Sequence, residues 1–165
     1  MSDMREAFGK AGFRDEKPHS RGGGPRPDGP GQSSSGQSLF PPNYPEYFDS
    51  KGYMQAELLK GKAEEIASRF EADGLRRHQL RAFYDHAKRQ LQRLGYGAPF
   101  EEIKPEIARL KAFAADRAGR SNNPIPATFK RFIDCNVDAV GDEKSFKSGF
   151  MPHFEAVVAY FPAKD

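Results

Sequence analysis

The chain contains no tryptophan, one cysteine and four histidines among its 165 residues. A single cysteine excludes an intramolecular disulfide, and burial of Cys135 as a small apolar residue is favoured over a catalytic role. No apolar run approaches the roughly 20 residues that cross a bilayer, and the first residues lack the apolar core of a signal peptide. These absences predict a soluble, cytoplasmic protein with no membrane contact.

Motifs of catalysis and of metal binding are also missing. The sequence has no Gly-x-Ser-x-Gly elbow and no Gly-x-x-x-x-Gly-Lys phosphate loop. His78 and His86 are eight residues apart, but neither belongs to a His-x-x-x-His or Glu-x-x-His pair. His153 and Glu155 are expected to be a pair on a helix surface rather than an acid and a base. The sequence therefore predicts no enzymatic activity, no metal and no cofactor.

Gly, Pro and Ser dominate residues 20–38, which have almost no apolar side chains to bury. This composition predicts disorder. We therefore divide the chain into a disordered tail and linker, 1–45, and a helical domain, 46–165. Segment 39–48 is rich in proline and aromatic residues, and it is either a strap that packs on its own domain or a docking peptide for a partner. The first reading is favoured.

From about residue 54 onward, apolar residues recur at spacings of three and four, which is typical of helices with one buried face. The pattern predicts an all-α fold, a compact bundle of about five helices. We expect these over 54–73, 75–94, 100–118, 126–140 and 146–161. Pro105 is expected to mark a helix restart, and Pro152 a kink or a division. Phenylalanines, including Phe113, are expected to supply much of the core.

Positive charge is concentrated in the middle of the chain. Residues 75–131 contain 13 Lys and Arg against 5 Asp and Glu, whereas 46–74 contain 4 against 7 and 132–165 contain 3 against 6. A net charge of +3 thus hides a basic centre between two acidic ends. Such segregation favours a polyanionic partner.

The basic residues recur on helix faces, where rows of Arg and Lys suit a phosphate backbone. The six candidate RNA-binding residues are Arg77, Arg81, Lys88, Lys111, Arg117 and Arg120. Because most phenylalanines fall on core faces, we expect backbone contacts without base readout. On charge alone, a basic helix face that is simply solvated explains the pattern as well as RNA binding does. The rival function is a helical protein–protein adaptor whose basic face docks an acidic protein.

Three stretches together resemble the small subunit of type III-A CRISPR effector complexes, the Csm complex. Residues 75–84 read Leu-Arg-Arg-His-Gln-Leu-Arg-Ala-Phe-Tyr, similar to a family helix that begins Leu-Thr-Thr-Ser-Gln-Leu-Arg-Lys-Phe-Tyr. Residues 110–120 are similar to Leu-Lys-x-Lys-x-x-Tyr-x-x-Gly-Arg, and 154–160 to Phe-x-x-Glu-Ala-x-Val-Ala-Tyr. Order and spacing agree across about 60–161.

The resemblance implies a non-catalytic helical bundle in several copies along a ribonucleoprotein filament. It would line the channel for guide and target RNA, beside the repeated backbone subunit and the large Palm-domain subunit. Arg81, Lys111 and Arg120 match motif positions of the family, whereas Arg77, Lys88 and Arg117 rest on charge alone.

The sequence also departs from the family pattern. Arg-Arg-His at 76–78 replaces the usual Thr-Thr-Ser helix start, which removes the N-cap hydroxyls. Ala82 replaces a lysine, and Asp116 replaces a tyrosine and places a negative charge beside Arg117.

Overall fold

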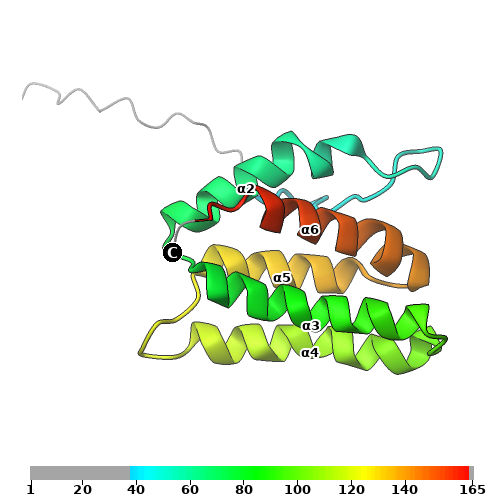
Figure 1. Ribbon diagram of the computed structural model, residues 1–165. Coiled ribbons are helices and arrows are strands. Elements are labelled where there is room, and N and C mark those ends of the chain that lie inside the picture. Colours follow the sequence, from blue (N-terminus) through cyan, green and yellow to red (C-terminus); the bar gives the residue numbers. More distant parts are fainter. Residues whose placement is uncertain (1–37, 164–165) are drawn as a thin grey trace, which may run out of the picture. The chain divides into compact units, whose positions relative to one another are not determined.

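The computed structural model describes residues 38–163, which from Leu39 onward form one compact unit. Its five α-helices are α2 Gly61–Ala72, α3 Arg77–Gly95, α4 Phe100–Ala118, α5 Ala127–Ala139 and α6 Met151–Tyr160 (Figure 1). A 3-10 helix, Ala56–Leu59, precedes α2, and a π-helical segment, Ser145–Phe150, leads into α6. The described residues contain no β-strand, only an isolated bridge between Phe48 and Met54. The predicted all-α fold is confirmed; the disorder predicted for 20–38 lies, apart from residue 38, outside the described residues.

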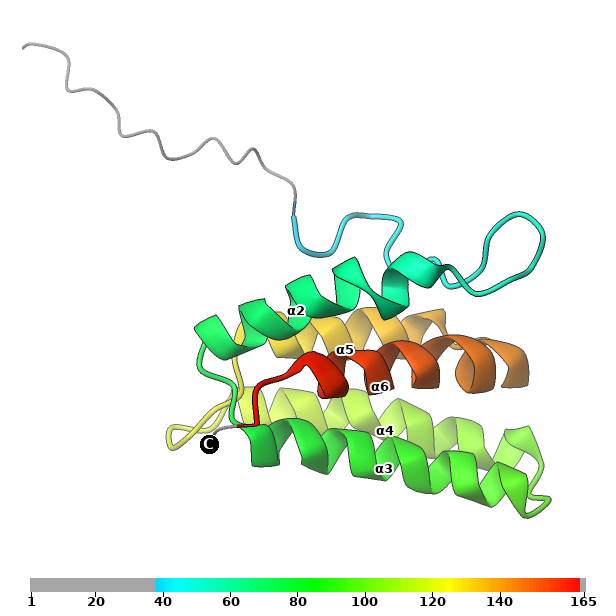
Figure 2. The ribbon, with the colours of Figure 1, turned by 45° about the horizontal axis from the view of Figure 1, so that its top comes forward.

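The helices pack in a closed ring, in the order α2, α6, α3, α4, α5 and back to α2. Helix α2 lies against α5 and α6, and α3 and α4 form a layer on the other side of that pair (Figure 2). The face of the α3–α4 layer that points away from the other helices is therefore open to solvent. This layer contains all of the candidate RNA-binding residues except Arg120, which follows the end of α4.

Local sequence features explain the ends of α2 and α3. Gly74 and Gly97 have φ angles of 92° and 98°, in the left-handed region that favours glycine just beyond a helix. At the start of α3, Gln79 supplies one half of a capping box: its Oε1 accepts the backbone N–H of the N-cap residue, Arg76, at 2.9 Å. Its Nε2 donates to the Asn123 carbonyl at 2.9 Å, which ties the start of α3 to the α4–α5 loop.

The two prolines behave differently. Helix α4 runs through Pro105 without interruption, so the predicted restart is wrong. Pro105 lacks the backbone N–H that would donate to the carbonyl of Glu101 in the first turn. Pro105 lies on the exposed side of the helix, where water can donate to this carbonyl instead. Pro152 lies at the start of α6, where the chain changes from π to α geometry, as the predicted division requires.

Phenylalanine rings fill the centre of the bundle. Phe132 of α5 contacts Phe70 of α2 and Phe154 of α6 at centroid distances of 5.4 and 5.3 Å, both edge to face. Phe129 contacts Phe83 of α3 at 5.0 Å in the same geometry. Edge-to-face pairs add to the stabilisation from burial alone. The aromatic cluster therefore joins four of the five helices directly, as expected from the phenylalanine content.

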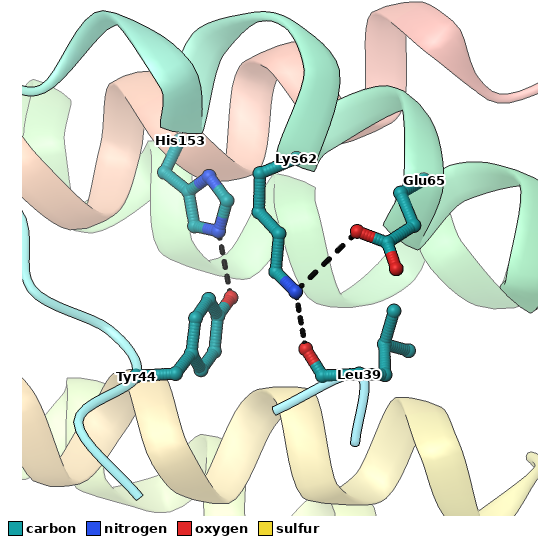
Figure 3. Close-up of polar contacts among 5 residues, drawn as sticks. All are labelled: Leu39, Tyr44, Lys62, Glu65 and His153. Atoms are coloured by element: carbon teal, nitrogen blue, oxygen red, sulfur yellow. Dashed lines mark hydrogen bonds and ion pairs between the residues drawn. The ribbon is translucent and has the colours of Figure 1, made fainter. Parts of the chain in front are cut away.

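Residues 39–48 pack on the bundle, and we call this segment the strap. Phe40 and Tyr47 are buried, and Phe40 lies 6.3 Å from the ring of Phe132. Lys62 of α2 donates to the carbonyl of Leu39 and also contacts Glu65, and Tyr44 reaches His153 of α6 (Figure 3). The interpretation as a strap on its own domain is confirmed, and the compact unit includes residues 39–45, which the predicted division assigns to the tail.

A buried hydrogen-bond network holds the strap, and its directions follow from chemistry. The Leu58 carbonyl can only accept, so Nδ1 of His153 donates to it at 2.7 Å, and Nε2 accepts the hydroxyl of Tyr44 at 2.6 Å. The Tyr44 oxygen accepts from Asn136 Nδ2 at 3.0 Å, and Asn136 Oδ1 accepts from Tyr47 at 2.8 Å. Both nitrogens of the imidazole are satisfied in its neutral form.

Burial lowers the pKa of His153 to about 4. The nearby charge of Lys62 lowers it further, and the bond to the Leu58 carbonyl opposes the shift. His153 is thus a neutral core residue, and its expected surface pairing with the exposed Glu155 is wrong.

Acid should destabilise the fold through His153. Because its pKa is lower in the folded chain than the usual value of about 6.5, its neutral form stabilises fully above pH ~6.5 and loses that effect as the pH falls toward about 4. We expect His153 to account for a loss of about 2–3 kcal/mol in the free energy of unfolding between pH ~7.5 and ~4.5. Urea denaturation of wild type and His153→Gln over that range measures this. The variant should be the less stable at pH ~7.5, and the difference should close in acid; His78→Gln, at an exposed site, should leave the wild-type profile unchanged.

Gly149 tests the packing of the strap. A Cβ at this position would lie 2.6 Å from two ring carbons of Tyr47, so alanine must push the strap ring outward. We expect Gly149→Ala to lower the free energy of unfolding by about 1–3 kcal/mol. Gly95→Ala is the matched control, because nothing lies within 4 Å of its added Cβ. Equal stability of the two variants would contradict the close contact.

Candidate nucleic-acid interface

Helix α3 carries most of the positive surplus. It contains five Lys and Arg residues against one acidic residue, Asp85, whereas α4 has four of each kind and α5 two of each. The charge segregation seen along the chain is therefore concentrated on one helix of the outer layer.

Arg77, Arg81 and Lys88 share one edge of α3, which we call the α3 stripe. The edge faces α6: Arg77 Nη1 donates to the carbonyl of Ala163, just beyond α6, at 2.9 Å. Tyr84 lies in the same row and packs on α6 through its ring. The three residues thus share one edge of the helix, as their spacing of four and seven residues indicated; that they bind RNA stays a prediction.

The charges of the α3 stripe are not neutralised within the described part of the chain. Arg81 is exposed and makes no ion pair there. Lys88 lies 5.7 Å from the centroid of the Tyr84 ring, a contact that leaves its charge available. Arg77 is half-buried and bonds to a neutral carbonyl. Three cations on a rigid helix therefore face solvent or neutral groups.

The candidates on and after α4 are paired with carboxylates instead. Lys111 Nζ lies 2.7 Å from Asp138 Oδ1 on α5, and this hydrogen bond raises the pKa of Lys111. Asp116 Oδ2 lies 2.8 Å from Arg120 Nη2 and 3.9 Å from Arg117 Nε. Asp116, the departure from the family pattern, thus takes two of the three predicted phosphate ligands. Exposed pairs of this kind are weak, but each must be broken before its cation can bind a phosphate.

The six candidates do not form one surface. Lys111 faces α5 through Asp138, whereas Arg117 lines a groove between α4 and α3. Arg120 follows the C-terminal end of α4. The α3 stripe lies on the opposite edge of α3 from that groove, next to α6. The structure thus brings three of the six together and separates the other three.

Two residues outside the predicted set belong to the same layer. Arg89, on α3, is exposed and makes no ion pair within the described residues. Phe113, expected in the core, keeps 41% of its surface exposed at the α3/α4 groove. The helical spacing pointed it inward, but Ile107, Leu110 and Ala114 already fill the buried face of α4. In the sequence, the only sign of its exposure is the position of Phe113 on the helical wheel, which is rotated away from the centre of the buried face.

Groups typical of a catalytic centre are not gathered in the described residues. No three His, Cys, Asp or Glu side chains there are placed as metal ligands. Cys135 is half-buried, and burial raises the pKa of its thiol, which disfavours the nucleophilic thiolate. None of the described helices is long and apolar enough to cross a membrane.

A comparison with family models identifies the chain. The model described as Csm2 Type III-A matches residues 53–164, from the end of the loop after the strap to the end of α6 and beyond. No curated protein and no solved structure gives a significant match. Since the matched range covers about two thirds of the chain and the whole helical bundle, this protein belongs to the Csm2 family, the small subunit of the type III-A Csm complex.

Proposed function

We propose that this chain binds guide and target RNA through the phosphate backbone, without sequence specificity and without catalysis of its own. Family membership makes it a structural subunit of a type III-A CRISPR effector complex. The observation that carries the RNA-binding part is the α3 stripe, where three cations lie on one helix edge without a carboxylate partner among the described residues.

The physical argument rests on counterion release. A cation already paired with a carboxylate gains little from a phosphate, because the old pair must be broken, whereas an unpaired one displaces condensed counterions from the RNA. Arg81 and Lys88 meet that condition within the described residues, and their side chains project from a 19-residue helix whose other face is packed in the core. Phosphates occur at every nucleotide, so such contacts are independent of sequence.

We also propose contacts with protein partners. The repeated backbone subunit, the large Palm-domain subunit and further copies of this chain are the expected neighbours in the complex. The acidic segments on either side of the basic centre, 46–74 and 132–165, offer the complementary charge for such contacts.

Alanine substitution on the α3 stripe tests the backbone contacts. We expect Arg81→Ala and Lys88→Ala each to lower affinity for a guide–target duplex and for a scrambled duplex equally. Each should reduce the slope of log affinity against log salt by about one. Fluorescence anisotropy over a salt series measures both quantities.

Arg131→Ala is the matched control, because Arg131 is also exposed and unpaired within the described residues but lies on α5. Its slope should equal that of wild type. Loss of affinity for only one of the two duplexes would contradict backbone-only contact, and a full-length chain that binds no RNA would favour a protein-docking role for the basic face.

Removing the carboxylate of Asp116 should strengthen binding. Asp116→Asn frees Arg117 and Arg120 and removes a charge that repels phosphate, so we expect affinity for RNA to rise severalfold at low salt. Glu64→Gln, an exposed site on α2, is the control for a general change in net charge. An equal rise in the two variants would mean that long-range charge, and not release of the two arginines, is responsible.

A further inference from the structure

The groove between α3 and α4 combines an exposed aromatic ring with two guanidinium groups. Its lining residues are Ala82, Phe83, His86, Arg89, Phe113 and Arg117. Its volume is about 190 Å³, smaller than the roughly 300–1,000 Å³ typical of sites for drug-sized molecules. A groove of this size can take a single flat ring system, and the groups attached to that ring would lie at its mouth.

The ring of Phe113 is held in a defined orientation. It meets the His86 ring at 89° with 5.4 Å between centroids. His86 is itself fixed, because its Nε2 lies 2.8 Å from the Glu106 carbonyl, which can only accept, so Nε2 donates. A ring that is held at one edge by a fixed neighbour, on a residue that is 41% exposed, is pre-organised for stacking.

The charges beside this ring favour an anion. Arg89 has no ion-pair partner within the described residues, and Arg117 is only 3.9 Å from Asp116, at the edge of ion-pair distance. The two guanidinium groups come from different helices and line the same groove. An aromatic ring that shares a groove with two arginines, one unpaired within the described residues and one weakly paired, matches the two halves of a nucleotide, a flat base and a charged phosphate.

We propose that the α3/α4 groove binds one unpaired nucleotide of RNA, with its base stacked on Phe113 and its phosphates held by Arg89 and Arg117. This inference rests on the proposed RNA-binding function and adds a base-contacting site to it. Stacking uses the π-face that every base presents, so the site is tolerant of sequence. It is also selective for unpaired nucleotides, because a base inside a duplex has both faces covered. Backbone contact on the α3 stripe and base stacking in the groove thus lie on opposite edges of the same helix.

The test compares two strands with equal phosphates. The probes are a short oligouridylate and the same strand with its bases removed, and affinity is measured for the full-length chain by anisotropy. Wild type should bind the base-containing strand about tenfold more tightly, the effect of one stacked base. Phe113→Leu should abolish that difference while preserving the fold, since the ring is peripheral and leucine retains its contact with α3.

Tyr96→Leu is the matched control for an exposed aromatic, because Tyr96 is 92% exposed on the α3–α4 turn and lines no part of the groove. It should keep the tenfold difference. A second readout is direct: 2-aminopurine in place of one uridine should lose fluorescence on wild type and on Tyr96→Leu, but not on Phe113→Leu.

The outcomes separate this site from the proposed function. Equal affinity of wild type for the two strands, or an unchanged difference in Phe113→Leu, would overturn the base site and leave backbone binding in place. Failure of wild type to bind either strand would overturn both. A loss of fluorescence that persists in Phe113→Leu would also overturn the site, since the base would then stack elsewhere.

Discussion

Burial of phenylalanine rings around Phe132 is the constraint on which the rest of the structure depends. This ring joins the strap, α2 and α6 to α5, and the adjacent Phe129 extends the cluster to α3. With these helices fixed at the centre, α4 can pack only on α3 and α5. The α3–α4 layer is held mainly by apolar packing, with a few polar contacts such as that between His86 and the Glu106 carbonyl, so most of its outward side chains are not needed for the core and can carry charge.

The position of a Lys or Arg in the bundle, more than the number of charges on its helix, decides whether it is free to bind a phosphate. Helix α4 carries as many carboxylates as cations and pairs Lys111 with a neighbouring helix, whereas α3 has a single acidic residue. The α3 stripe and the α3/α4 groove lie on opposite edges of that one helix. With RNA bound at both places, α3 would contact the phosphate backbone on one edge and an unpaired base on the other. The hydrogen-bond network around His153 is buried and would contact neither.

Much of this could be predicted from the sequence. Spacings of three and four between apolar residues indicated the helices, because burial of one face is what a bundle requires, and the run of proline and aromatic residues at 39–48 indicated a strap. The pairings could not be predicted. Asp138 is 27 residues from Lys111, and the position of Phe113 at the rim depends on how α3 and α4 cross. The role of His153 was also hidden, since its partners, Leu58 and Tyr44, are about a hundred residues away along the chain.

Arginine side-chain Nε–Hε resonances offer the most direct measurement of the central claim, that unpaired cations on α3 meet the RNA. Titrating the labelled full-length chain with single-stranded RNA reports each guanidinium separately. The account predicts early, large shifts for Arg77, Arg81 and Arg89, and little change for Arg69, which is paired with Asp73 on α2. Shifts confined to arginines outside α3, or equal shifts for all of them, would contradict it.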